Sequence, residues 1–355
     1  MQIGTDFRRR LEAVLACPTA PFHEGRVHRA ILDAVRASPR LRAREDAFGN
    51  LEVTYGPGRP RLLFACHTDH PALEATGNGT ARILGGMKPK ALRGTRLRLF
   101  DGTLSGSRAG AKAGEKAVKL EGGRVPKGVP LVLDLPRATV GRHVRGRAID
   151  DLLAVAACLA MFDRLAAARW RGTVGALFTR AEEVGFAGAL AWVRTTASKR
   201  ATTIVNLEMS SARPHTPQGN GPILRVGDRM TAFTQDVLGE LEATASKLAV
   251  TEKGFRWQRA LMDGGACEAT VYAHAGFRTG ALCLPLMNYH NHAPEGGVAR
   301  EYVRADDAEN LVRWMTAHAR AFARIDGRRA RDERLARLWR EHRAKLARTA
   351  PEVNR

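Results

Sequence analysis

The 355-residue sequence predicts an α/β fold, in which a mostly parallel sheet with helices on both faces is interrupted by a small β-rich domain. Three observations lead to this prediction. Near-continuous apolar runs of strand length, such as Arg61–Cys66 and Thr173–Phe178, are typical of strands covered on both faces. Longer apolar runs of helical length alternate with them, as in Leu152–Ala168. Between about residues 72 and 142 the apolar runs shorten and glycine, lysine and arginine become frequent, which indicates an inserted domain.

The first part of the chain supplies two predicted helices and two predicted strands. The helices cover Phe7–Ala16 and Glu24–Ala37, where apolar residues recur at helical spacing. The strands cover Leu51–Tyr55 and Arg61–Cys66, and turn residues separate them.

His67 and Asp69 follow the second of these strands immediately. A histidine at a strand end can offer one ring nitrogen to a metal while a nearby carboxylate holds the ring in position. Taken alone, the two residues fit a satisfied core histidine beside a surface aspartate better than a metal site.

The segment 72–142 carries short apolar runs separated by turn residues, as expected of a small β-rich domain. We therefore expect three parts: a main domain formed by residues 1–71 and 143–327, an inserted domain at 72–142, and a basic helical tail at 328–355. The apolar runs of the insertion are Ala81–Leu84, Leu97–Phe100, Ala117–Leu120 and Leu131–Leu135.

Two pairs of acidic residues flank the helix and the strand that follow the insertion. Asp150 and Asp151 stand at the predicted start of the long helix, where the helix dipole favours negative charge. Glu182 and Glu183 follow the next strand. Adjacent carboxylates at the end of a buried strand repel each other and lose hydration, so they are either solvated loop residues or ligands of a divalent metal.

Further strands and helices alternate over the rest of the chain. The strand Thr202–Leu207 is predicted to end on Glu208. The strand Arg278–Leu284 is predicted to stop before Pro285 and to deliver the sequence Tyr289-His290-Asn291-His292. The predicted helices of this part are Thr231–Ala249, Ala269–Ala275, Arg304–Ile325 and Arg328–Arg348.

Potential metal ligands thus follow four predicted strands, and one more stands at a helix start. The carboxyl edge of a parallel sheet is where such folds place their sites. Carboxylates and imidazoles together suit two divalent ions, zinc above all, with cobalt or manganese as alternatives. Of two adjacent glutamates, one can bind metal while the other acts as general base. The sequence therefore predicts a dinuclear metallohydrolase site in the main domain.

The formal net charge of +21 is concentrated in the insertion, with 14 basic against 5 acidic residues, and in residues 328–348, with 9 against 3. A basic surface attracts anionic substrates, nucleic acids or acidic partners. No basic motif is interleaved with aromatic residues, so we expect no specific nucleic-acid partner. No apolar run approaches the length of a membrane span and no signal peptide is recognisable, so we expect no membrane partner and a cytoplasmic location.

The order of these motifs resembles the co-catalytic zinc aminopeptidases of the glutamyl and tetrahedral type. The shared order is H-x-D after a strand, an inserted β domain, D-D at a helix start, E-E-V-G-x-x-G-A, an acid after the next strand and a late histidine, over about residues 7–325. The resemblance implies an enzyme that removes N-terminal residues from peptides. It also implies a homo-oligomer, with the inserted domain mediating assembly or covering the cleft.

The resemblance further implies a role for each matching residue. Asp150 would bridge two metals and Glu182 would be the general base. Asp69 would support His67. The implied metal ligands are His67, Asp150, Glu183, Glu208 and His290.

Two departures from the family's pattern concern the ligands. The family usually has aspartate where Glu208 stands. Its final motif is shortened here by one residue, which leaves His290 or His292 as the last ligand, and His290 is favoured because it lies nearer the strand end.

Two other functions remain open beside the aminopeptidase. One is a related amidohydrolase or deacylase of acylated amino acids, and the other is a non-catalytic peptide-binding descendant. An aminopeptidase pocket needs an acidic group for the free amino terminus, and Glu268 is a candidate by its position.

The basic tail contains a thin apolar stripe. Two interpretations remain open: the stripe packs against the body or another subunit, or the helix is a solvated tail. The stripe consists of Leu335, Leu338, Trp339 and Leu346.

Overall fold

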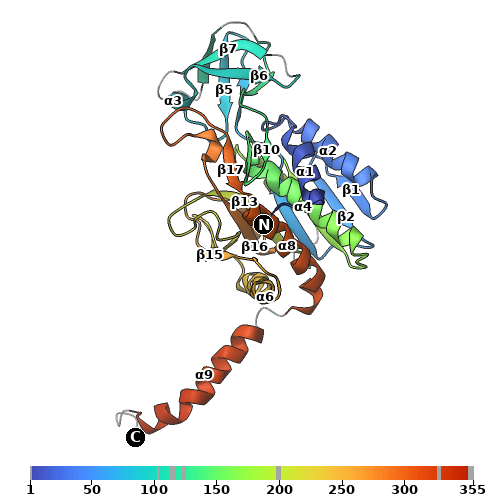
Figure 1. The fold of residues 1–355 in the computed structure, drawn as a ribbon, viewed down its shortest axis with the longest axis vertical. Helices are drawn as coiled ribbons and strands as arrows, with labels where there is room; N and C mark the ends of the chain where they lie inside the picture. Colours follow the sequence, from blue (N-terminus) through green and yellow to red (C-terminus); the bar gives the residue numbers. More distant parts are fainter. Residues whose placement is uncertain are drawn as a thin grey trace.

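The computed structural model describes residues 2–101, 104–111, 117–121, 125–196, 201–325 and 329–350. Figure 1 shows a central sheet with helices on both faces and a barrel beyond one end of it. One helix, α9 (Arg329–Arg348), extends away from the body at the opposite end (Figure 1). Within the described ranges, no helix is long and apolar enough to cross a membrane.

The central sheet has eight strands in the order β1-β2-β12-β3-β13-β16-β14-β15. Its middle strands β12, β3, β13 and β16 run parallel, while β1, β2 and β14 each pair antiparallel with a neighbour. The predicted α/β fold is confirmed, with antiparallel strands added on both sides of a parallel centre. The bounds are β1 (Leu41–Glu45), β2 (Leu51–Tyr55), β3 (Leu62–His67), β12 (Val174–Thr179), β13 (Thr203–Ser211), β14 (Ile223–Arg225), β15 (Gln258–Ala260) and β16 (Arg278–Leu286).

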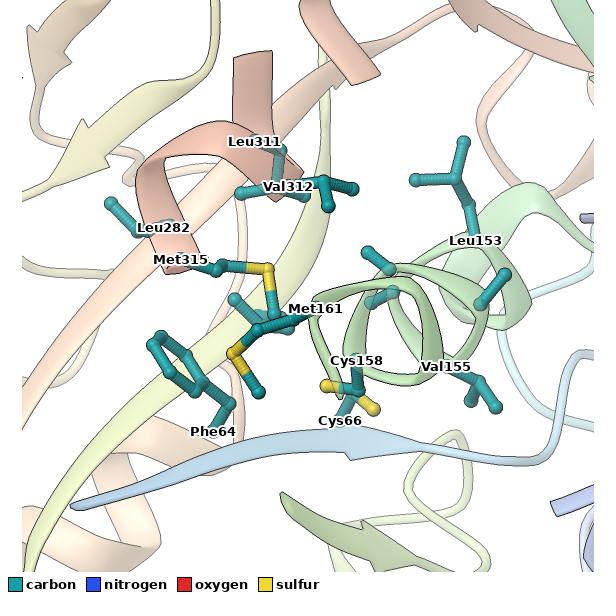
Figure 2. Packing of buried hydrophobic residues seen from close by; sticks show 14 of the residues in the cluster. Phe64, Cys66, Leu153, Val155, Cys158, Met161, Leu282, Leu311, Val312 and Met315 are labelled. Carbon is teal, nitrogen blue, oxygen red and sulfur yellow. The ribbon is translucent and has the colours of Figure 1, made fainter. Parts of the chain in front are cut away.

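The middle strands β3 and β12 are buried at every position, and β13 is buried at all but its last, because helices cover both faces of the sheet. Phe64 and Cys66 of β3 face the larger helical layer, whereas Leu63 and Ala65 face the smaller one. Figure 2 shows Phe64 and Cys66 beside Met161 and Cys158 of the long helix α4, with α8 beyond. The helices are α1 (Thr5–Leu15), α2 (Gly25–Arg36), α4 (Ile149–Ala167), α6 (Gln235–Thr251) and α8 (Ala305–Ala321) in the larger layer, and α5 (Ala187–Thr195) and α7 (Glu268–His274) in the smaller one.

The inserted segment contains a closed barrel with the strand order β4-β5-β8-β7-β6-β9. Apolar residues alternate along its strands and form a core of their own, as Val118 and Leu120 do in β8. The exact domain boundaries stay a prediction. The elements are β4 (Ala72–Ala75), β5 (Thr80–Leu84), α3 (Pro89–Leu92), β6 (Thr95–Leu99), β7 (Leu104–Ala111), β8 (Ala117–Glu121) and β9 (Pro130–Leu133).

A small three-stranded sheet connects the barrel to the main domain. It has the order β10-β11-β17, and β11 pairs antiparallel with both of its neighbours. Because β11 leads into α4 and β17 leads into α8, this sheet lies directly beside the carboxyl edge of the central sheet. Its strands are β10 (Thr139–Val140), β11 (His143–Gly146) and β17 (Glu301–Arg304).

Two strands of the central sheet run further than the sequence predicts. β13 continues past Glu208 to Ser211, and β16 continues through Pro285 to Leu286, so the prediction that Pro285 ends its strand was wrong. The pairing of β14 with β16 stops at Cys283. Pro285 therefore lies beyond the positions where the antiparallel neighbour would need its missing N–H.

The tail helix α9 does not bury its apolar stripe. Leu335 and Trp339 are 64% and 60% exposed, and Leu338 and Leu346 are also exposed. Packing of the stripe on the body of the same chain, which is one part of the first alternative, is therefore not observed, whereas packing on another subunit stays untested. Residues 328 and 351–355 of the predicted tail lie outside the described residues.

Candidate metal centre

The residues predicted to bind metal come from separate elements and meet at the carboxyl edge of the central sheet. Parallel strands end at this edge, which is why ligands far apart in sequence converge there. His67 is the last residue of β3, Asp150 lies at the start of α4, Glu182 and Glu183 follow β12, Glu208 lies in β13, and His290 lies in the short 3-10 helix η1 (Tyr289–Asn291) after β16.

His67 stands at the centre of one group of potential ligands. Its Nε2 lies 3.4 Å from Asp150 Oδ1 and 3.8 Å from Glu208 Oε1. Glu182 Oε2 is slightly further, at 4.0 Å. His67, Asp150 and Glu208 each offer an atom within 4.8 Å of the others, as a shared cation requires.

His290 stands at the centre of a second group. Its Nε2 lies 3.3 Å from Glu183 Oε2 and 3.7 Å from Asp150 Oδ2. Asp150 therefore faces both histidines, with one carboxylate oxygen toward each. These two groups of potential ligands therefore share Asp150, and a third possible group combines His67 with Glu182 and Glu183.

The chemistry of these groups fits divalent metals. The five side chains of the two groups, together with Glu182, are between 1% and 11% exposed. Asp150 Oδ1, Glu183 Oε1 and His290 Nε2 are buried without a hydrogen-bond partner among the described residues. Buried carboxylates in such number are unfavourable unless positive charge compensates them, and carboxylate oxygens and imidazole nitrogens are ligands for zinc, cobalt and manganese.

The carboxylates impose a strong negative potential on both histidines. Burial alone would lower the pKa of His67, but Glu182, Asp150, Asp69 and Glu208 together raise it well above its usual value. Burial would likewise lower the pKa of His290, yet the carboxylates, Glu183 first, raise it to about 9. The site thus stabilises positive charge at these two rings, whether a proton or a metal supplies it.

Asp69 supports more of the centre than the sequence predicts. Its Oδ1 lies 3.4 Å from Nδ1 of His67, in the expected supporting place. Its two oxygens also accept hydrogen bonds from the backbone N–H groups of Glu182 at 3.0 Å and Glu183 at 3.1 Å. One carboxylate therefore orients the imidazole and holds the Glu182-Glu183 segment against it.

Glu301, which the sequence analysis missed, accepts hydrogen bonds from the two backbone segments that carry Asp150 and His290. Its Oε2 accepts hydrogen bonds from the backbone N–H groups of Ile149 at 2.9 Å and Asp150 at 3.0 Å. Its Oε1 accepts one from the backbone N–H of His290 at 2.9 Å. The only signal in the sequence is an acid directly before the apolar pair Tyr302-Val303, which is too weak to single it out.

The segment after β16 turns sharply and presents its two histidines differently. Asn288, His290 and Asn291 all have left-handed backbone conformations, with φ between 54° and 62°. Nε2 of His290 points to the carboxylates, whereas Nε2 of His292 accepts a hydrogen bond from the backbone N–H of Lys88 at 2.9 Å. The geometry therefore favours His290 as the last ligand.

Asn291 occupies the position where the family's ligand order would put a histidine, and it has a structural task here. Its side-chain amide donates to the backbone carbonyls of Arg147 at 2.8 Å and Ala299 at 3.1 Å. Its Oδ1 contacts Nε2 of His70 at 3.1 Å, and Nδ1 of His70 contacts the backbone carbonyl of Asp150. His70 and Asn291 thus stabilise the backbone on which Asp150 is carried.

Glu268 is near the centre but faces the protein interior. It is 1% exposed, and its Oε2 accepts hydrogen bonds from the hydroxyl groups of Thr179 at 2.8 Å and Tyr272 at 3.3 Å. Burial, opposed in part by His67, raises the pKa of Glu268 to about 7. Its predicted role in binding a substrate's amino terminus stays a prediction.

A parallel-centred α/β sheet that gathers histidine and carboxylate side chains at its carboxyl edge is the arrangement expected of a metal-dependent hydrolase. The family model of the M42 glutamyl aminopeptidases matches residues 109–312, more than half of the chain. The chain belongs to this family and is a peptide hydrolase, and peptidases of the family depend on metal. The family inferred from the order of the sequence motifs is thereby confirmed.

Solved structures of aminopeptidases share this fold. The TET1 peptidase of Pyrococcus horikoshii is 22% identical with a TM-score of 0.72, over 88% of this chain and 99% of that one. A TET aminopeptidase from a marine sediment archaeon of the Thaumarchaeota is 20% identical with a TM-score of 0.76, over 90% and 97%. An aminopeptidase from Desulfurococcus kamchatkensis is 18% identical with a TM-score of 0.74, over 91% and 96%. A comparison with curated protein sequences finds no match.

Proposed function

We propose that this protein is a dinuclear metal-dependent aminopeptidase that removes N-terminal residues from peptides. The observation that carries the proposal is the position of Asp150, whose two oxygens face His67 and His290 separately. One cation would be held by His67, Asp150 and Glu208, and the other by Asp150, Glu183 and His290. Zinc is the metal that this ligand set suits best, with cobalt and manganese as alternatives.

Glu182 is the proposed general base. When bound, the two divalent cations polarise the scissile carbonyl and lower the pKa of the attacking water. Glu182 Oε2 lies 4.0 Å from His67 Nε2, so its carboxylate is close enough to the proposed ions to exchange a proton with the attacking water. The Glu182 carboxylate accepts the water's proton and returns it to the leaving amine.

A small cavity beside Glu208 is the proposed pocket for the first side chain of the peptide. Its volume is about 90 Å³, and its lining includes Ser210, Met262 and Arg225. Arg225 is 3% exposed; its terminal nitrogens donate to Ser210 Oγ and to backbone carbonyls of the pocket wall, and its Nε has no hydrogen-bond partner among the described residues. A buried guanidinium favours an acidic side chain, in keeping with the glutamyl specificity that the family's description states.

The experiment measures metal content and hydrolysis of aminoacyl anilides by the same preparation. We expect about two ions per chain, loss of hydrolysis on chelation, and faster cleavage of glutamyl than of leucyl anilide. Arg225→Met should reverse this preference and leave the metal content unchanged. Absence of bound metal, together with no activation by zinc, cobalt or manganese, would contradict the proposal.

A second candidate, hydrolysis of acylated amino acids, is favoured by one observation. Glu268, the residue considered for binding a free amino terminus, is almost fully buried. Including N-acetylglutamyl anilide beside glutamyl anilide separates the two functions, because an aminopeptidase requires the free amine.

We further propose a homo-oligomer in which the inserted barrel takes part. The TET1 peptidase of Pyrococcus horikoshii can assemble into a tetrahedron or a large octahedral shell. The barrel has a core separate from that of the central sheet, so its outer surface is available for contacts between subunits. Light scattering that shows only monomers would contradict this assembly without affecting the metal centre.

A further inference from the structure

The tail helix α9 lies beyond the residues that the family model matches. The family match ends at residue 312, within α8. About nine-tenths of this chain suffices to cover 97–99% of the TET structures. Because α9 follows α8 and extends from the body (Figure 1), the metal centre and the sheet do not depend on it for their contacts.

The apolar side chains of α9 gather on one face of the helix. The four side chains follow one another after three, one and seven residues. At 100° per residue, this spacing places all four within about a third of the helix circumference. All four are exposed, with fractions between 39% and 64%. They are Leu335, Leu338, Trp339 and Leu346, called the Leu/Trp stripe below.

The remaining faces of α9 are strongly basic. Residues 329–348 contain eight basic and three acidic residues. By the same helical spacing, three arginines lie opposite the stripe together with Glu333 and Glu341, while Arg343 and Lys345 flank it on either side. The three opposite residues are Arg337, Arg340 and Arg348.

Charge narrows the choice of what covers the Leu/Trp stripe. Residues 329–348 carry an excess of five positive charges, so the α9 helix of another copy would repel this one. An anionic partner is therefore favoured. A nucleic acid would satisfy the arginines but would leave the large apolar side chains of the stripe in water.

An anionic lipid surface satisfies both faces at once. Leucine and tryptophan side chains enter the boundary between headgroups and acyl chains, and arginine and lysine side chains remain among the negative headgroups. We propose that α9 is an interfacial anchor that lays the Leu/Trp stripe into an anionic phospholipid surface and holds the peptidase there. The expectation of no membrane partner rested on the lack of a spanning segment, and a helix lying in the membrane plane needs none.

The test uses the full-length protein and vesicles of phosphatidylcholine, alone or mixed equally with phosphatidylglycerol. We expect sedimentation with the mixed vesicles at low salt, at least about tenfold weaker partitioning onto pure phosphatidylcholine, and release at high salt. Trp339 is 60% exposed, whereas Trp192 and Trp314 are buried and the other two tryptophans are half-buried. Binding should therefore shift the tryptophan emission to shorter wavelength, and Trp339→Phe should remove that shift.

Two matched double variants separate burial of the stripe from simple charge attraction. Leu335→Glu with Leu338→Glu adds two negative charges within the stripe. Ala344→Glu with Ala347→Glu adds the same charge on the basic face, at two exposed positions. Both variants should bind the vesicles less because of the added charge. Partitioning of the leucine variant should fall at least about a hundredfold further than that of the alanine variant, because the leucine variant also loses two leucine side chains that would be buried in the lipid.

The outcomes either support the anchor or overturn it. Absence of partitioning onto phosphatidylglycerol vesicles overturns it, as does an equal loss in the two double variants. Binding of polyuridylate with no binding of vesicles would point to nucleic acid instead and also overturns it. Hydrolysis of a soluble anilide should be the same in all variants, so failure of the anchor is distinguishable from failure of the proposed peptidase.

Discussion

Glu301→Gln should weaken metal binding at the His290 side of the centre and leave the fold intact. The Glu301 carboxylate accepts three backbone hydrogen bonds, two on Oε2 and one on Oε1. A glutamine has one acceptor oxygen, and the better of its two orientations keeps the bonds from Ile149 and Asp150. Its amino group then faces the backbone N–H of His290, so that one bond to a charged acceptor is lost.

The size of the effect follows from that single bond. A hydrogen bond to a charged group contributes about 1.5–3 kcal/mol, which corresponds to a change of about 10- to 150-fold in an equilibrium constant. This range agrees with the loss of about 10- to 100-fold in metal affinity that is typical when a residue orienting a ligand is removed. We therefore expect one of the two binding steps to weaken by about this factor while the other stays unchanged.

The assay is calorimetric titration of the metal-free protein with zinc, followed by hydrolysis at saturating zinc, where activity should recover. Glu309→Gln is the matched control, because Glu309 is also a buried glutamate that accepts hydrogen bonds, from the backbone N–H of Gly4 and from Arg164. It lies in α8, away from the centre, so it should change stability without changing metal affinity. Unaltered zinc affinity in Glu301→Gln, or an equal loss in Glu309→Gln, would refute the reasoning.

Three further predictions test the remaining assignments. Glu182→Gln should keep both metals and lose about 10²- to 10⁴-fold in turnover, whereas Glu183→Gln should lose metal, and similar zinc titrations for the two would contradict their separate roles. His290→Ala should lose at least one metal and nearly all activity, whereas His292→Ala should keep both ions, and elemental analysis decides between them. Burial lowers the pKa of His318 to about 3, so between that pH and about 6.5 the unfolded chain binds more protons than the folded chain. The free energy of unfolding should therefore fall by up to about 5 kcal/mol as the pH falls through this range, and His318→Gln should flatten this dependence in urea unfolding.

The middle strands and most of the candidate ligands were predictable for a common reason. A strand covered on both faces is mostly apolar, so polar residues at or just past its end are conspicuous, as His67 is at the end of β3 and the Glu182-Glu183 pair is shortly after β12. The shared position of Asp150 between two histidines was not predictable in the same way. It depends on distances between elements that pack together only in the folded chain.

The features that the sequence analysis missed depend on tertiary contacts. Strand β1 buries only Leu41 and exposes its other residues, so it lacks the alternation of a half-buried strand and forms by pairing with β2. Glu301 lies in a short strand of four residues, and its importance comes from reaching the backbone at Ile149 and at His290. No local sequence pattern predicts the contact of Glu301 with the backbone at Ile149 or at His290.

The spread of the centre along the chain has a consequence for the time at which activity arises. The residues that form it begin at His67 and end at Glu301, which ties two of the others together. Ribosomes make proteins from the N-terminus, so a growing polypeptide lacks the last of these residues until most of its length has been synthesised. A half-made chain therefore lacks part of the candidate centre, whose last residue, Glu301, is added only late in synthesis.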